Sequence, residues 1–151
     1  MIIFILRHAD RLQEDDLSAK GRDRARLLAR MLRGSGVSIA YRSDTARARQ
    51  TLEPLKEMLD GKLQVETIGI TAPATPDGHV KQIIDAIKAL PPDKVAVVVS
   101  HSDTVGTIAE GLGGRSGAPI GDNEFDRLFI LARPKTGPTD CVQVRFGEPT
   151  P

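Results

Sequence analysis

The chain has 151 residues, and its 21 Lys and Arg residues almost balance its 20 Asp and Glu residues. The resulting net charge of +1 excludes a general attraction to nucleic acid or to anionic lipid. The single cysteine, Cys141, excludes an internal disulfide framework and a zinc site built from cysteines. A chain of this length is typical of one compact domain, which we expect to span residues 1–151.

The apolar opening, residues 1–6, is the first predicted element. It is far shorter than the roughly 20 residues that cross a membrane, and no small-residue cleavage site follows it. Because it is apolar throughout rather than alternating, it predicts a strand buried on both faces. We therefore expect a cytoplasmic protein with neither a membrane nor a nucleic acid as partner.

Strands and helices alternate along the rest of the chain. Helices are expected at 18–32, 46–58, 80–90 and 104–112, and further strands at 37–41, 63–70, 95–100, 127–132 and 141–146. A loop is expected at 72–78, and the last two strands are expected to pair as a hairpin. This order predicts an α/β fold with three layers, α/β/α, whose mainly parallel central sheet ends in a C-terminal antiparallel hairpin.

Polar residues gather where the predicted strands end. The first strand runs into Arg7 and His8, the strand at 95–100 runs into His101, and Arg47 lies just after the strand at 37–41. Ligands of parallel α/β folds bind beyond the carboxyl ends of the strands. We therefore expect the two histidines to face each other across one crevice, with both arginines beside them.

Two histidines and two arginines suit phosphoryl transfer. A neutral imidazole is a good nucleophile when its other nitrogen is held by a hydrogen bond. Arg7 and Arg47 could hold the phosphoryl oxygens with permanently charged forks, and a helix N-terminus could add backbone N–H donors. A second imidazole would stabilise the charge of the transition state. This chemistry needs neither a metal nor another cofactor.

Four segments resemble motifs of the histidine phosphatase superfamily, also called phosphoglycerate mutase-like. Arg7-His8-Ala9 resembles its Arg-His-Gly motif, with Ala9 in place of the more common Gly. The other three segments are 17–21 (LSAKG), 47–51 (RARQT) and 100–105 (SHSDTV). They occur in the family's order and span most of the chain. The small size resembles that of the SixA-type phosphohistidine phosphatases.

The resemblance implies a phosphatase that acts through a covalent phosphohistidine on His8. Arg7, Arg47 and His101 would complete the phosphate pocket, with Ser102 beside them. Arg42 is a candidate for contacting the distal part of the substrate. The substrate would be a phosphorylated small molecule or a protein that carries phosphohistidine.

Many members of this family use a carboxylate as acid and base. Asp77, in the predicted loop at 72–78, is our candidate for that role. The alternatives are Glu66, Asp85, His79, Asp10, Asp103 and the absence of a dedicated acid. The last would fit phosphohistidine, whose imidazole leaves with less help.

Other interpretations stay open. The pairs His8-x-Asp10 and His101-x-Asp103 resemble metal ligands, although Arg7 and Arg47 would repel a cation. His79 is expected at the surface or in a loop. The whole chain could be a phosphate- or phosphoprotein-binding module with weak turnover, or a transferase of the phosphoglycerate mutase type. Short loops that leave the site open to water favour hydrolysis over transfer.

Overall fold

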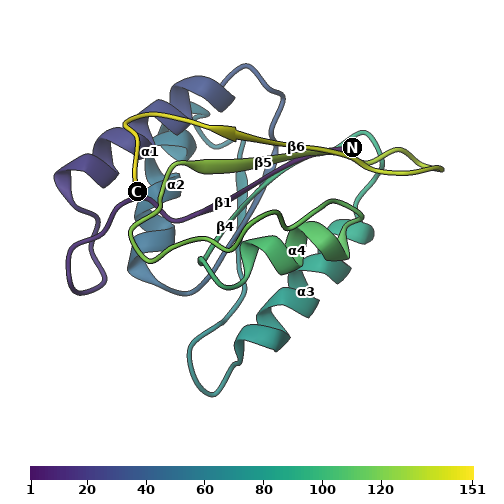
Figure 1. Ribbon diagram of the computed structural model, residues 1–151. Helices are drawn as coiled ribbons and strands as arrows, with labels where there is room; N and C mark the ends of the chain where they lie inside the picture. Colours follow the sequence, from purple (N-terminus) through teal and green to yellow (C-terminus); the bar gives the residue numbers. More distant parts are fainter.

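Six strands form one sheet in the computed structural model of residues 1–151, in the order β3-β2-β4-β1-β5-β6 (Figure 1). The strands are β1 (Ile2–Arg7), β2 (Ile39–Arg42), β3 (Gln64–Thr67), β4 (Val95–Ser100), β5 (Arg127–Ala132) and β6 (Asp140–Arg145). The first four run parallel, whereas β5 is antiparallel to β1 and β6 is antiparallel to β5. The predicted mainly parallel sheet with a C-terminal hairpin is confirmed.

Helices cover both faces of this sheet (Figure 1). On one face, α1 (Ala19–Leu32) and α2 (Ala46–Met58) enclose a core cluster of 14 buried residues with the sheet. On the other face, α3 (Pro76–Lys88) and α4 (Val105–Gly111) enclose a cluster of 16. The three predicted layers are therefore present. None of the helices combines the length and the apolar composition that crossing a membrane requires.

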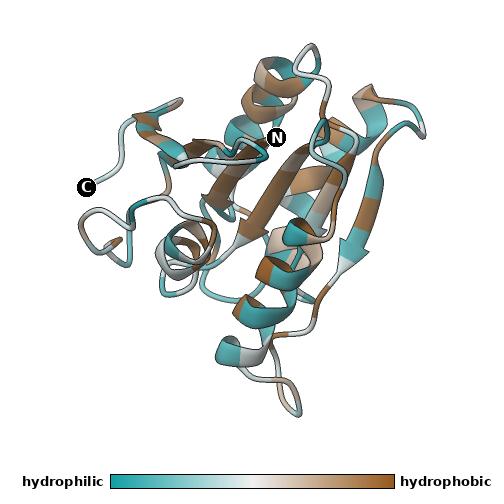
Figure 2. Ribbon diagram, turned by 90° about the vertical axis from the view of Figure 1, so that its right-hand side faces the viewer, coloured by the Kyte–Doolittle hydropathy of each residue, from teal (hydrophilic) through white to brown (hydrophobic).

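The two central strands bring the candidate residues together. β1 and β4 pair in parallel register, with Arg7 opposite Ser100, and both strands are strongly hydrophobic along their length (Figure 2). The backbone N–H of His8 donates to the carbonyl of Ser100 over 2.9 Å. His8 and His101 therefore follow the carboxyl ends of two adjacent parallel strands and lie at the same end of the sheet.

The segment at 17–21 shapes the loop that follows β1. Ser18 caps α1 by accepting a hydrogen bond from the N–H of Gly21 over 3.1 Å. A Cβ atom at position 21 would lie 1.9 Å from the carbonyl oxygen of Asp10. Only glycine allows the helix to approach the loop this closely.

Helix α3 begins earlier than the sequence prediction. Its first residue is Pro76, and Thr75 caps it by accepting from the N–H of Gly78 over 3.0 Å. Proline at the first helical position lacks only an N–H that would have no helical partner. The end of the predicted loop at 72–78 is therefore the first turn of a helix. The third strand is also shorter than predicted, 64–67 instead of 63–70.

Candidate active site

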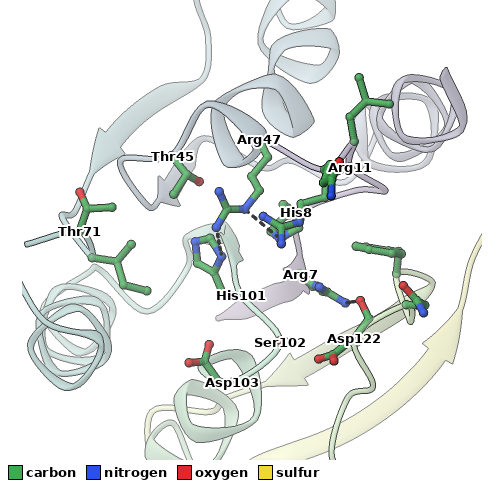
Figure 3. A pocket seen from close by; sticks show the side chains of 15 residues that line it. Arg7, His8, Arg11, Thr45, Arg47, Thr71, His101, Ser102, Asp103 and Asp122 are labelled. Carbon is green, nitrogen blue, oxygen red and sulfur yellow. Dashed lines mark hydrogen bonds between the residues drawn. The ribbon is translucent and has the colours of Figure 1, made fainter. Parts of the chain in front are cut away.

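A polar cavity of about 760 Å³ lies at the carboxyl ends of β1 and β4 (Figure 3). It is lined by five of the predicted residues: Arg7, His8, Arg47, His101 and Ser102. Nine further residues line it that the sequence did not predict for the site: Arg11, Leu12, Gln13, Thr45, Ile70, Thr71, Asp122, Asn123 and Phe125. The expectation that both histidines and both arginines meet at one crevice is thus met by the geometry.

His8 is almost completely buried and has a defined tautomer. Its Nδ1 lies 2.9 Å from the carbonyl oxygen of Ala9, which can only accept, so Nδ1 carries the hydrogen. Its Nε2 therefore holds a lone pair, and the Nε–H of Arg47 donates to it over 3.3 Å. Burial lowers the pKa of His8 to about 3, the hydrogen bond to Ala9 opposes this shift, and the nearby charges of Arg7 and Arg47 add to it. The imidazole is neutral at neutral pH.

His101 faces His8 across the cavity. The ring centroids are 5.2 Å apart and the ring planes meet at 62°. Nδ1 of His101 lies 3.5 Å from a terminal nitrogen of Arg47, and its Nε2 lies 2.8 Å from the hydroxyl of Ser43. Burial lowers the pKa of His101 to about 4, Arg47 lowers it further, and Asp103 raises it. One guanidinium therefore contacts both imidazoles (Figure 3).

Arg7 is held by neutral groups. One of its terminal nitrogens donates to the carbonyls of residues 121, 122 and 124 over 2.9 to 3.1 Å. Its guanidinium lies 4.1 Å from the ring centroid of Phe125, a cation–π contact. Burial lowers the pKa of Arg7 to about 10, and Arg11 lowers it as well, so the group stays charged at neutral pH. Its buried Nε–H has no hydrogen-bond partner in the protein.

Arg47 is held by a carboxylate. Its terminal nitrogen pairs with Asp15 over 2.7 Å, and Asp15 also accepts from the backbone N–H groups of Ala46 and Arg47. Burial alone would raise the pKa of Asp15, but these hydrogen bonds outweigh burial and lower it. The N–H of Ala48 is taken by the hydroxyl of Thr45. The expected free donors at a helix N-terminus are therefore absent from α2.

Two tentative site residues lie outside this cavity. Asp77 is exposed in the first turn of α3, because the helix begins at Pro76, and it does not line the cavity. Arg42 turns back to donate to the carbonyl of Ser43 over 2.9 Å and does not line the cavity either. The structure thus does not bring either residue to the cavity. The carboxylates that do line the cavity are Asp103 and Asp122.

Among the other alternative acids, Asp10 and Asp85 are paired outside the cavity, and Glu66 does not line it. Asp10 forms a buried ion pair with Arg24 over 2.6 Å, and Arg24 donates further to the carbonyls of Phe146 and Glu148. Asp85 pairs with Lys81 on the surface of α3. No group of three or more His, Cys, Asp or Glu side chains is arranged to hold a metal ion.

His79 is buried, contrary to the prediction of a surface or loop position. It shares one face of α3 with Ile83 and Ile87, because the helix already includes residue 79. Its Nδ1 donates to the carbonyl of Ile68, so its Nε2 accepts from the hydroxyl of Ser100 over 2.8 Å. Burial lowers the pKa of His79, and the ring contacts the end of β4 through Ser100.

Known proteins share both sequence and fold with this chain. Residues 3–68 match the model of the histidine phosphatase superfamily (branch 1). No curated protein sequence matches the chain. Among solved structures, the protein histidine phosphatase SixA, solved with tungstate, is 26% identical with a TM-score of 0.70, covering 96% of this chain and 97% of that one.

Two further structures are similar in fold alone. A mycobacterial glucosyl-3-phosphoglycerate phosphatase is 18% identical, with a TM-score of 0.63 over 86% of this chain and 92% of that chain. The phosphoglycerate mutase of Plasmodium falciparum is 14% identical, with a TM-score of 0.58 over 97% of this chain and 89% of that chain. The resemblance to the histidine phosphatase superfamily is therefore confirmed, by sequence over residues 3–68 and by fold over nearly the whole chain.

Proposed function

We propose that the chain is a phosphatase that needs no metal and forms a covalent phosphohistidine on His8. One observation carries this proposal: the imidazole of His8 is neutral and presents its Nε2 lone pair beside the guanidinium of Arg47. A nucleophile toward phosphorus requires that protonation state. The hydrogen bond from Nδ1 to the carbonyl of Ala9 holds the tautomer.

The reaction would proceed in two displacements at phosphorus. First, Nε2 of His8 attacks, a P–N bond forms and the bond to the leaving group breaks, with a proton delivered to the leaving atom. A water molecule then attacks the same phosphorus, gives up a proton and breaks the P–N bond, which releases inorganic phosphate and restores His8. Hydrogen bonding of Nδ1 to Ala9 supports the positive charge that the phosphorylated ring carries.

Both arginines would hold the phosphoryl oxygens. Arg7 and Arg47 stay charged at all physiological pH values and can bind oxygens through two N–H groups each. The buried Nε–H of Arg7 lacks an acceptor within the protein. Buried donors without a partner are rare, which supports an anion as part of the working site. The SixA protein histidine phosphatase was solved with tungstate, an oxyanion of similar shape to phosphate.

The substrate would be a phosphomonoester or a phosphohistidine side chain. The named relatives act on protein phosphohistidine in one case and on glucosyl-3-phosphoglycerate in another. The cavity is polar, and twelve of its fifteen lining residues are not hydrophobic. Free access of water to such a site favours hydrolysis over transfer. We place this reaction in the cytoplasm.

Phosphoryl trapping tests the proposal. The protein is incubated with labelled acetyl phosphate, in the presence of a chelator, and label on His8 is located by mass spectrometry of peptides. We expect the parent protein to be labelled and His8→Ala to be unlabelled, with turnover of p-nitrophenyl phosphate falling at least about 10³-fold.

His79→Gln is the matched control, because it changes a buried histidine outside the cavity. It should keep the label on His8. Equal labelling of His8→Ala and the parent would disprove the mechanism. Phosphate binding without any turnover would indicate a binding module, and loss of activity to the chelator would indicate a metal enzyme.

A further inference from the structure

Asp77 lies outside the cavity, so the proton for the leaving group has to come from a residue that lines it. In-line displacement places the leaving group on the side of phosphorus away from the nucleophile. Figure 3 shows Thr45 and Thr71 on the same side of the Arg47 guanidinium, with His8 on its other side. The donor to the leaving atom should lie on the side of Thr45 and Thr71.

A chain of hydrogen bonds links this side of the cavity to His101. Nε2 of His101 lies 2.8 Å from the hydroxyl oxygen of Ser43, which lies 2.9 Å from the hydroxyl oxygen of Thr45. All three residues are buried, with Thr45 5% exposed. Of these three residues, His101 and Thr45 line the cavity and Ser43 does not.

The neighbours of His101 and Thr45 determine which atom donates in each of these hydrogen bonds. Arg47 has only donors, so the Nδ1 of His101 that faces it holds a lone pair, and Nε2 carries the hydrogen. Ser43 therefore accepts from His101 and donates to Thr45. The oxygen of Thr45 also accepts from the N–H of Ala48 over 3.3 Å. Its own hydrogen has no acceptor within the protein and is left for the cavity.

Thr71, the other hydroxyl on this side, does not compete for the role. Its hydroxyl donates to the carboxylate of Asp44, which also accepts from the backbone N–H groups of residues 70 and 71. These bonds fix the loop after β3 as a wall of the cavity. Of the two hydroxyls on this side, that of Thr45 is thus the one free to donate, and the Asp103→Asn variant below separates it from the carboxylate of Asp103, which also lines the cavity.

We propose that Thr45 donates to the leaving atom of the substrate, as the last member of a proton path from His101 through Ser43. This inference rests on the proposed function and names a further catalytic residue for it. As the bond to the leaving group breaks, the hydrogen of Thr45 moves to the leaving atom. The hydrogen of Ser43 moves to Thr45, and the Nε2 hydrogen of His101 moves to Ser43.

His101 supplies the proton for this path. Phosphoryl oxygens beside Nδ1 place negative charge there and favour the doubly protonated ring. The imidazolium then gives up its Nε2 hydrogen and keeps the one on Nδ1, so one proton leaves and the ring becomes neutral. In the second displacement the attacking water gives its proton to the solvent, from which His101 regains one, so the path serves the first displacement alone.

The test compares substrates whose leaving groups differ in basicity. p-Nitrophenolate is weakly basic and leaves without being protonated, whereas a strongly basic alkoxide needs a proton in order to leave. For Thr45→Val we expect kcat with an alkyl phosphate to fall about 10²-fold, and kcat with p-nitrophenyl phosphate to fall less than about 3-fold. Thr45→Ser retains the hydroxyl and should restore the parent's ratio. Ser43→Ala breaks the path in its middle and should reproduce the loss without changing the residue that caps α2.

Thr75→Val is the matched control, because Thr75 caps α3 as Thr45 caps α2 but is exposed and outside the cavity. Both valine variants should lower Tm by about 2–4 °C, and only Thr45→Val should change the ratio of the two substrates. Equal losses on both substrates, or the same selective loss in Asp103→Asn instead, would overturn the role of Thr45. A parent protein without label on His8 would overturn the proposed function as well, so the two failures are distinguishable.

Discussion

The two arginines of the cavity are held in opposite ways. Arg7 lies against three backbone carbonyls and the ring of Phe125, none of which carries a charge. Arg47 lies against the carboxylate of Asp15 and the two imidazoles. Carbonyls fix the direction of a guanidinium and leave its charge available, whereas a carboxylate offsets part of that charge.

This difference indicates a division of labour. A phosphoryl group meets in Arg7 a guanidinium without a paired carboxylate, with the charges of Asp122 and Asp10 nearby, but has to share Arg47 with Asp15. Arg47 in turn contacts His8, the proposed nucleophile, and the second imidazole, where charge would develop in the proposed reaction. We therefore expect Arg7 to contribute mainly to substrate binding, and Arg47 mainly to the rate of the chemical step.

Lysine substitutions test this division and should have the largest effects. Arg47→Lys keeps the charge but loses the fork that reaches both imidazoles, so we expect kcat to fall about 10²–10³-fold with KM little changed. Arg7→Lys should mainly raise KM. Steady-state kinetics with p-nitrophenyl phosphate measures both. If the two variants lose kcat and KM in the same proportions, the division of labour is wrong.

Acid should weaken the protein through the imidazoles that lie between these arginines. The folded pKa values of His8 and His101, about 3 and about 4, lie below the ordinary value of 6.5. Unfolding therefore takes up protons below pH 6.5, and stability falls with pH down to those values. The slope is up to about 1.4 kcal/mol per pH unit for each histidine.

Thermal unfolding from pH 7 to pH 4 measures this slope. Inorganic phosphate should reduce it, because an anion between the arginines favours the protonated rings. His8→Asn should flatten the slope, whereas Lys81→Ala, on the exposed face of α3, should leave it unchanged. A stability that stays constant from pH 7 to pH 4 would contradict the buried, neutral state of both rings.

Asp15→Asn makes Arg47 resemble Arg7 by removing the charge beside it. We expect inorganic phosphate to inhibit about 3- to 10-fold more strongly and kcat to fall several-fold, because Arg47 gains available charge but loses its fixed direction. Asp16→Asn is the matched control, since Asp16 contacts Gln50 at the surface. Identical inhibition of the two variants would show that Asp15 does not limit the charge of Arg47.

Phe125→Leu should have the smallest effect. It removes the cation–π contact on Arg7, which lies 4.1 Å from the ring, and leaves the three carbonyls in place. We expect KM to rise about 2- to 5-fold at constant kcat. A larger change in kcat than in KM would place Phe125 in the chemical step rather than in the support of Arg7.

The strand ends were the part of the site that sequence could predict. His8 and His101 follow apolar runs, and parallel strands end at a common edge, so their meeting needed no knowledge of the loops. The partners of Arg7 lie 114 to 117 residues away along the chain. No local pattern connects such distant residues, and the support of Arg7 could not be predicted.

Asp77 and His79 were misplaced for a local reason. The apolar spacing of α3 becomes clear only at Val80, so the sequence predicts a helix from there, with Asp77 in a loop and His79 at the surface or in a loop. Thr75 followed by Pro76 is the pattern of an N-cap and a first helical position. That signal would have placed Asp77 in an exposed first turn and His79 on the buried face.

The buried pair of Asp10 and Arg24 has a practical consequence for the far end of the chain. Arg24 also donates to the carbonyls of Phe146 and Glu148, so the loop after His8 and the last residues share one guanidinium. A change in residues 146–148 is therefore not remote from the cavity. Its effects would reach the loop after His8 through Arg24, and kinetic comparisons among variants should keep these residues unchanged.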